Sequence, residues 1–202
     1  MSVPTRAIAE ALLEEASRMN PGPWVSHVRH VADAAGRIAQ AAGMDAERAF
    51  ALGLTHDIGR RSGVTNLRHM TDGYHLMQEL GYTDAARVCI THSYPINDAD
   101  MYFGEWDLNL EDAALLRNVL ANTEFNDEDR LIQLCDALAL PSGYCLLEKR
   151  LVEVALRHGT PEFLSRKWRA TLDIKDYFET RMNASIYTLL PGVVENTFGF
   201  PG

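Results

Sequence analysis

Apolar residues recur at intervals of three and four positions along almost the whole chain, a spacing that places them on one face of an α-helix. Runs that alternate apolar and polar residues between turn signals, as half-buried strands do, are hard to find. The pattern predicts an all-α protein, a single-domain helical bundle over residues 1–202 whose helices bury their apolar faces together. We expect helices at residues 5–19, 25–43, 45–57, 70–80, 83–92, 110–122, 127–140, 145–158 and 161–189.

The ends of several predicted helices carry residues that favour a stop or a start. The sequence Asn-Pro-Gly-Pro at 20–23 ends the first helix, and Gly43 and Gly81 stand where a C-terminal cap is needed. Asn126 and the acids after it favour a helix start, because they accept hydrogen bonds from free N–H groups and suit the helix dipole. The helical pattern breaks down over residues 93–109, which predicts a long loop of the kind that often carries substrate contacts.

The composition changes this picture little, but the charge narrows the choice of partners. The hydrophobic share is 47% and the charged share 23%, both ordinary for a globular domain. A formal net charge of −9 argues against a nucleic-acid polymer as partner, because such binding depends on a surplus of Lys and Arg that neutralises phosphates. A small anionic substrate stays open, since a bound divalent cation can reverse the local charge.

Cysteine usage and hydropathy indicate the cellular location of the protein. The three cysteines Cys89, Cys135 and Cys145 contain no C-x-x-C pair and cannot all pair within one chain. No stretch approaches the ~20 apolar residues that span a bilayer, and the N-terminal segment carries acids within its apolar stripe, unlike a signal peptide. We therefore expect a cytoplasmic protein that does not bind membranes. The sequence leaves both a monomer and a homodimer open.

Four residues place imidazole or carboxylate groups among apolar helix positions. His27 lies beside the inward stripe of its helix, where a histidine on its own is more often a core residue than a ligand. His56 and Asp57 end an apolar segment, and a carboxylate there carries a desolvation cost unless a cation or hydrogen bonds compensate. Asp136 repeats this anomaly within LIQLCDALAL. Two aspartates and two histidines form the O/N ligand set of a first-row transition metal.

Two further histidines lie between these elements and indicate a second ion. His69 lies four residues before Gly73, and His92 lies at the end of the apolar helix DAARVCITHS. Two metals about 3.5–4 Å apart, bridged by a carboxylate, clamp both the attacking and the leaving oxygen of a phosphoryl transfer. Asp57 is the natural bridge. Ligand types alone do not separate iron, manganese, cobalt, nickel and zinc, and they leave one or two ions open.

The order of these motifs resembles that of the HD superfamily of metal-dependent phosphohydrolases, over roughly residues 24–140. A bare His-Asp doublet is common by chance, whereas the ordered set on helices is specific. The two additional histidines resemble the dimetal branch, which includes the YqeK-like hydrolases of dinucleoside tetraphosphates. The resemblance implies an HD-type core with a first ion held by His27, His56, Asp57 and Asp136 and a second held by Asp57, His69 and His92.

The resemblance also implies an activity, the hydrolysis of a phosphoester or phosphoanhydride in a nucleotide or another small phosphorylated metabolite. Metal-bound hydroxide would attack phosphorus, because a divalent ion lowers the pKa of its bound water towards neutrality. Asp57 is the expected catalytic residue. Arg60, just after the His-Asp doublet, could hold two phosphate oxygens, with Arg61 and Arg68 assisting. For each arginine, an exposed charge on a loop is the alternative.

Two other functions stay open. HD-type mixed-valence di-iron oxygenases carry the same histidine-rich set and act on small hydroxylated compounds, so ligand identity does not separate them from hydrolases. A non-catalytic nucleotide-sensing module would need the helical scaffold but not the ligands. All six ligand positions are intact in this chain. The hydrolase is therefore the favoured hypothesis.

Residues 141–202 extend the chain beyond the last aspartate, where the resembling hydrolases tend to finish. This helical C-terminal extension could cover the pocket, mediate dimerisation or complete the bundle, and its apolar spacing favours the last. Arg150 with its charged neighbours and the Tyr144 ring could approach a substrate, but a solvated helix face and a loop aromatic are their commoner roles. Tyr94, Phe103 and Trp106 fit either stacking on a base or a small satellite core. The histidines expected to be structural or at the surface are His30, His75 and His158.

Overall fold

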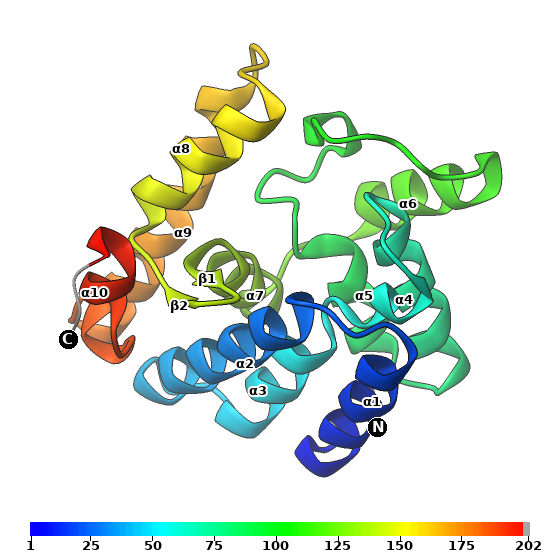
Figure 1. Ribbon diagram of the computed structural model, residues 1–202, viewed down its shortest axis with the longest axis horizontal. Helices are drawn as coiled ribbons and strands as arrows, with labels where there is room; N and C mark the ends of the chain where they lie inside the picture. The colour runs from blue at the N-terminus through cyan, green and yellow to red at the C-terminus, as the bar shows by residue number, and fades with distance from the viewer. Residues whose placement is uncertain (200–202) are drawn as a thin grey trace.

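The computed structural model describes residues 1–199 and confirms the predicted all-α architecture (Figure 1). Within these residues the strands form a single two-stranded antiparallel hairpin, and no helix is long and apolar enough to cross a membrane. The α-helices are α1 (Arg6–Met19), α2 (Trp24–Ala41), α3 (Ala46–Thr55), α4 (Arg68–Glu79), α5 (Thr83–Thr91), α6 (Leu110–Asn122), α7 (Asp127–Leu138), α8 (Leu147–His158), α9 (Leu164–Met182) and α10 (Val193–Phe198). The shorter elements are the 3-10 helices η1 (Ile58–Ser62), η2 (Ala99–Met101) and η3 (Ile186–Leu189) and the strands β1 (Ala139–Leu140) and β2 (Gly143–Tyr144).

Helices α2 and α3 pack side by side near the centre of the molecule (Figure 1). Their apolar faces are buried, with Val31 and Ile38 of α2 and Leu52 of α3 fully inaccessible. The two backbones approach so closely that a Cβ atom at Gly53 would lie 2.6 Å from the Ala32 Cα. This close packing fixes the end of α3, and with it the predicted His-Asp doublet, against the middle of α2.

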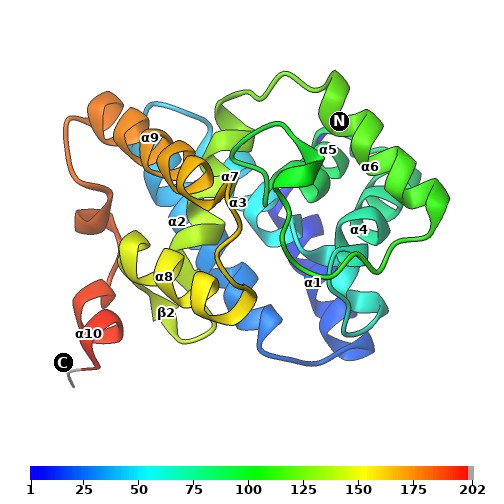
Figure 2. The ribbon, with the colours of Figure 1, turned by 90° about the horizontal axis from the view of Figure 1, so that it is seen from above.

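The remaining helices lie on two sides of this central pair. Figure 2 shows α4, α5 and α6 on one side and α8, α9 and α10 on the other, with α2, α3 and α7 between them. A second apolar cluster, under the loop that joins α5 to α6, contains Tyr94, and Trp106 packs against it. These two aromatic residues therefore belong to a satellite core, one of the two roles expected for them.

Helix α7 begins as predicted, at a capping box. The Asn126 side chain accepts a hydrogen bond from the Asp129 N–H at 3.1 Å, and the Asp129 carboxylate accepts one from the Asn126 N–H at 3.0 Å. The Glu128 N–H also donates to the Asn126 side chain, so the cap satisfies several of the free N–H groups at this end of the helix. The cap sets the register of α7 and hence the face on which its later residues point.

The chain leaves α7 through the β1–β2 hairpin, where the sequence pattern predicts helix as far as residue 140. The helix stops at Leu138, and Gly143 adopts a φ of 134°, a backbone conformation that glycine tolerates because it has no Cβ. Tyr144 then anchors the hairpin on α2, since its hydroxyl donates to the Asp33 carboxylate at 2.8 Å. Contacts with α2 thus set the direction in which α8 leaves the core.

The last predicted helix, over residues 161–189, is shorter in the structure. Asn183 adopts a left-handed conformation with φ 51° and ends α9, and the chain continues as η3. Asparagine is among the few residues that take this conformation readily, because its short side chain bonds to nearby backbone. The helix predicted over 45–57 likewise ends at Thr55, and η1 follows after Asp57.

Candidate metal centre

The structure brings the six predicted ligands together, although several separate elements supply them. The ligands are His27 of α2, His56 at the end of α3, Asp57 before η1, His69 in the first turn of α4, His92 at the end of α5 and Asp136 of α7. His56 exposes 0% of its surface, and Asp57, His69 and His92 expose 3% each. We call these six residues the ligand cluster. Imidazoles and carboxylates at this depth require compensating partners.

Asp57 lies at the centre of the ligand cluster and faces three imidazole rings. Its Oδ1 lies 3.0 Å from the His69 Nε2 and 3.5 Å from the His92 Nε2, and its Oδ2 lies 3.9 Å from the His56 Nε2. The ligand atoms of Asp57, His69 and His92 all lie within 4.8 Å of one another. The same holds for His27, His56 and Asp57. Asp57 is common to both groups, which is the place the sequence predicts for a bridging carboxylate.

Asp136 joins the cluster from α7. Its Oδ1 lies 2.9 Å from the His27 Nε2 and 3.7 Å from the His56 Nε2. The side chain is 26% exposed, against 4% for Asp57. Asp136 is therefore the more accessible of the two carboxylates, and it lines the cavity that opens over the cluster.

Backbone carbonyls fix the orientation of three rings. The Nδ1 atoms of His56 and His92 lie 2.8 Å from the Gly53 carbonyl oxygen and 3.0 Å from the Cys89 carbonyl oxygen, and the Nδ1 of His69 contacts a carbonyl one turn back. A carbonyl oxygen only accepts hydrogen bonds, so each Nδ1 carries the proton. In the neutral rings the Nε2 atoms then carry lone pairs, the arrangement found around metal-bound histidines, and the His69 lone pair accepts a hydrogen bond from Arg60 at 3.4 Å.

Two buried atoms of the cluster, His56 Nε2 and Asp57 Oδ1, have no hydrogen-bond partner among the described residues. The His69 Nε2 lies 3.0 Å from Asp57 Oδ1, but it has no proton to donate because the ring is protonated at Nδ1. An unpaired buried donor or acceptor costs about 1–3 kcal/mol, and a charged one costs more. A cation would satisfy both atoms, so the residues fit a divalent metal ion.

At Asp57 and His92 the surroundings favour the protonation states that bind metals, whereas at His56 burial is outweighed by the charges of Asp57 and Asp136, which raise the pKa of the ring. Burial by itself raises the pKa of the Asp57 carboxyl, but the charges of Arg60, His69 and His56 outweigh it and hold that pKa well below its usual value. Burial, reinforced by the neighbouring His56, lowers the pKa of His92 to about 3. Asp57 is thus ionised and His92 neutral at pH 7, as metal ligands must be.

Close backbone packing brings η1 onto α4. Gly59 follows the His-Asp doublet by two residues, and a Cβ atom there would lie 2.0 Å from the His69 carbonyl oxygen and 2.5 Å from the Gly73 nitrogen. Gly73 in turn faces α5, where a Cβ atom would lie 3.0 Å from the Cys89 Sγ. The missing side chains let η1, α4 and α5 approach closely enough for their ligands to meet.

One of the three predicted substrate arginines lies at the cluster. The Arg60 Nε donates to the Asp57 Oδ2 at 2.5 Å, and Arg60 lines the cavity. Arg61 instead pairs with Glu15 of α1 at 2.7 Å, and Arg68 pairs at 3.2 Å with an acid one turn along its own helix. Neither of these two lines the cavity in the described part of the chain. Of the three, Arg60 alone is placed to meet a ligand there.

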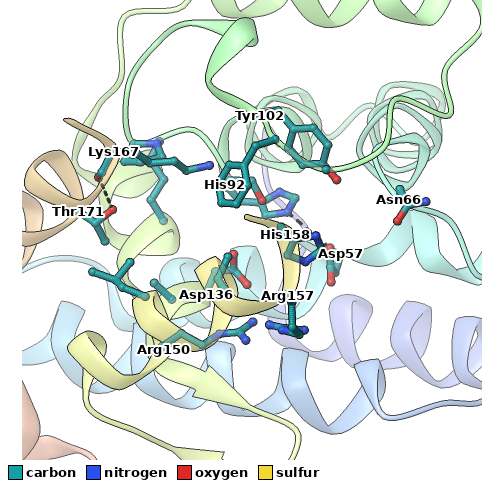
Figure 3. Close-up of a pocket in the computed structure, with 18 of the residues that line it drawn as sticks. Asp57, Asn66, His92, Tyr102, Asp136, Arg150, Arg157, His158, Lys167 and Thr171 are labelled. Carbon is teal, nitrogen blue, oxygen red and sulfur yellow. Dashed lines mark hydrogen bonds and ion pairs between the residues drawn. The ribbon is translucent and has the colours of Figure 1, made fainter. Parts of the chain in front are cut away.

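A cavity of about 530 Å³ opens over the ligand cluster, a size typical of pockets that enclose small organic ligands. Five of the six ligands line it among the described residues, with His56 behind them. The helices α8 and α9 contribute another wall, which carries Arg150, Arg157 and Lys167 (Figure 3). Phe103, from the segment predicted as a loop, lines the cavity as well.

Sequence reasoning left this second wall open but did not favour it. The sequence pattern does not distinguish Arg157 and Lys167 from other basic residues, and for Arg150 it favours a solvated helix face over a substrate contact, whereas all three line the cavity. One signal was available: Arg150 and Arg157 are seven residues apart, so they share a helix face with the apolar residues between them. The extension therefore does more than complete the bundle, the role that its apolar spacing favours.

The three histidines outside the motifs have ordinary partners or exposed positions. The His30 Nδ1 lies 2.9 Å from the Leu140 carbonyl oxygen, and His75 pairs with Asp112 at 2.9 Å. His158 is exposed, as expected, but it also stands at the rim of the cavity. None of the three belongs to the ligand cluster.

An all-α fold with a buried set of imidazoles and carboxylates able to hold a metal defines a helical metal-binding protein. Comparison with protein-family models gives a match to the HD domain over residues 24–140. The chain therefore belongs to the HD domain family, whose members are generally metal-dependent hydrolases. No curated protein and no solved structure matches the chain. The family match covers the range over which the motifs show the resemblance, and it ends in β1, before α8.

Proposed function

We propose that the protein is a metal-dependent phosphohydrolase that cleaves a phosphoester or phosphoanhydride of a nucleotide or another small phosphorylated metabolite. The observation that carries this proposal is the buried cluster around Asp57, in which His56 Nε2 and Asp57 Oδ1 lack hydrogen-bond partners. The cluster opens into a cavity sized for a small organic molecule. Membership of the HD family supports the same class of reaction.

The ligand cluster would hold one or two divalent ions. His27, His56, Asp57 and Asp136 would bind the first, and Asp57, His69 and His92 the second. A bound ion supplies Lewis acidity and activates water as a nucleophile at neutral pH. Iron, manganese, cobalt, nickel and zinc all suit this ligand set.

The chain's own residues bind and orient the substrate. Arg60 donates to the Asp57 carboxylate, the Thr65 carbonyl oxygen and the His69 ring, and its remaining N–H groups can donate to phosphate oxygens. Asp136 and His27 form a linked pair at the cavity surface, so they face the reacting group directly. The buried rings behind them keep bulk water away from Asp57, which strengthens every charge interaction there.

Parallel assays of phosphate release and oxygen consumption test this proposal. The full chain is loaded separately with iron, manganese and cobalt and given a panel of nucleoside monophosphates, nucleoside bisphosphates and dinucleoside polyphosphates. We expect metal-dependent phosphate release from at least one compound. Oxygen uptake without phosphate release would reject hydrolysis and favour the di-iron oxygenase. Well under one equivalent of any metal after reconstitution would favour a non-catalytic module.

A further inference from the structure

The cavity wall formed by α8 and α9 is basic. Arg150, Arg157 and Lys167 line it, and no acidic residue of these two helices does so in the described part of the chain. We call these three residues the basic wall. None of them forms an ion pair with a described residue, whereas Arg48 pairs with both Asp84 and a glutamate. Unpaired cations gathered in one cavity of a chain with net charge −9 indicate a place for an anion.

Lys167 is half-buried, like Arg150, whereas Arg157 is exposed. The Lys167 Nζ lies 3.3 Å from the Met101 carbonyl oxygen and 5.1 Å from the centroid of the Phe103 ring. Burial lowers its pKa to about 8, although the charge of Asp136 opposes the shift. The ammonium group therefore stays mostly protonated at neutral pH without a carboxylate partner. Such an arrangement costs stability unless a ligand supplies the missing negative charge.

Lys167 lies across the cavity from Asp57. None of the three side chains of the basic wall forms an ion pair with Asp57 or Asp136, although the charge of Asp136 acts on Lys167. Figure 3 shows Lys167 and Asp57 on opposite sides of the cavity, with Asp136 between them. A single phosphate held at Asp57 would therefore leave Lys167 without its anion.

Apolar side chains line much of the remaining cavity. They include the aromatic rings of Trp24 and Trp168 and the aliphatic side chains of Leu151 and Val154. Such surfaces bind an uncharged organic moiety by burying its apolar area. The cavity therefore combines two polar regions with apolar surface.

We propose that the basic wall is a second anion-binding subsite that selects substrates with two anionic groups. One phosphoryl group would lie at the ligand cluster, and a second phosphate would bind Arg150, Arg157 and Lys167. An uncharged moiety between the two would contact the apolar surface. This inference rests on the proposed function, because it takes the ligand cluster as the place of the scissile group. The C-terminal extension then determines specificity.

Calorimetric titration of the metal-loaded full chain with inorganic phosphate tests the subsite without requiring turnover. We expect two phosphate sites in the wild-type protein, one at the metal and one at the basic wall. Arg150→Gln/Arg157→Gln should weaken the second site about tenfold or more, since each lost charge-assisted hydrogen bond is strong, and leave the first unchanged. The matched control is Arg166→Gln/Arg169→Gln, which removes two arginines from exposed positions of α9 outside the cavity.

A second measurement links the subsite to substrate choice. The wild-type enzyme should prefer a nucleoside 3′,5′-bisphosphate over the 5′-monophosphate in kcat/KM by about tenfold or more, and the Arg150/Arg157 variant should lose that preference. Lys167→Gln should also lower it, whereas Lys167→Arg should retain it because the charge is kept. Thermal unfolding confirms that each variant folds.

The subsite and the hydrolase proposal can fail independently of each other. Equal phosphate binding in the wild type and the Arg150/Arg157 variant, or an equal loss in the Arg166/Arg169 control, overturns the subsite. If the second phosphate site depends on Arg150 and Arg157 but no compound releases phosphate with any metal, the subsite stands and the hydrolase proposal fails.

Discussion

The cavity has two walls, a metal-binding wall that carries the ligand cluster and the basic wall. They differ in burial, in charge and in whether they lie within the residues that match the family. The first is built by α2–α5 and α7 within residues 24–140, and most of its ligands are almost inaccessible. The second is built by α8 and α9 outside that range, and its side chains are partly or fully exposed. A buried, interlocked site tolerates little change, whereas an exposed helix face tolerates substitution. On the proposed function, one wall sets the reaction and the other sets the substrate.

The largest expected effect comes from Asp57→Asn, which removes the central carboxylate of the metal-binding wall. The substitution keeps the shape of the side chain but removes the charge that both ligand groups share. We expect loss of metal retention and a fall in phosphate release of about 10²–10³-fold or more. Metal analysis and initial rates measure both effects. The control is Asp33→Asn. The Asp33 carboxylate lies outside the cluster and accepts a hydrogen bond from Tyr144, so this variant should bind metal normally.

Gly59→Ala should break the metal-binding wall through the backbone alone. The added methyl group would overlap the His69 carbonyl oxygen, so η1 and α4 must separate, at a cost of about 3 kcal/mol in the free energy of unfolding. Urea denaturation measures this loss, and metal content should fall with it. The matched change beyond the basic wall is Gly159→Ala, which meets no atom within 4 Å but places a side chain at φ 93°. It should cost about 1–3 kcal/mol through backbone strain and leave metal content intact.

His92→Ala should separate the second metal site from the first within the metal-binding wall. His92 contacts Asp57 but belongs only to the second ligand group, so the first ion should remain. We expect one equivalent of metal in place of two and turnover reduced by about 10–100-fold. Metal content and turnover equal to those of the wild type would show that His92 holds no second ion, and would leave the first site of the enzyme intact.

Lys167→Met should give the smallest effect, and one of opposite sign. The folded-state pKa of about 8 lies below the ordinary lysine value of 10.5, so the charged lysine destabilises the ligand-free protein at neutral pH. Methionine should raise the free energy of unfolding by about 1 kcal/mol at pH 7.

The pH dependence of this gain provides its own check. Between pH 8 and 10.5 the unfolded chain holds more protons at Lys167 than the folded protein, so wild-type stability rises with pH relative to the variant. The difference between the two proteins should therefore be full below pH 8 and shrink above it. A loss of stability on substitution at pH 7 would indicate that Lys167 has a structural role.

The ligand cluster was accessible to sequence reasoning because its residues contradict their surroundings. A carboxylate in an apolar stripe, as at Asp57 or Asp136, has few explanations other than a cation or strong hydrogen bonds, and the helical spacing shows which face it occupies. The helices themselves follow from the same periodicity. The left-handed Asn183 and the turn at Gly143 could not be read in this way, because both residues are common where no helix ends.

The basic wall could not be predicted, because arginine and lysine on a helix are ordinarily exposed. Whether Arg150 and Arg157 meet solvent or a cavity depends on the direction in which α8 leaves the core. That direction follows from the hairpin and its contact with α2, which are tertiary features. Arg61 and Arg68 show the converse: they stand near the His-Asp doublet in sequence, but acids of α1 and α4 hold them away from the cavity.

The hairpin after α7 has a consequence for how such a protein can diversify. The Tyr144 hydroxyl contacts both the Asp33 carboxylate and the His30 carbonyl oxygen of α2, and the Asn196 amide of α10 donates to the Tyr144 carbonyl oxygen at 2.8 Å. The attachment of the hairpin therefore does not depend on the side chains that α8 and α9 present to the cavity. The cavity-facing residues of α8 and α9 can therefore change without moving the hairpin, so new ligand preferences can arise without disturbing the ligand cluster.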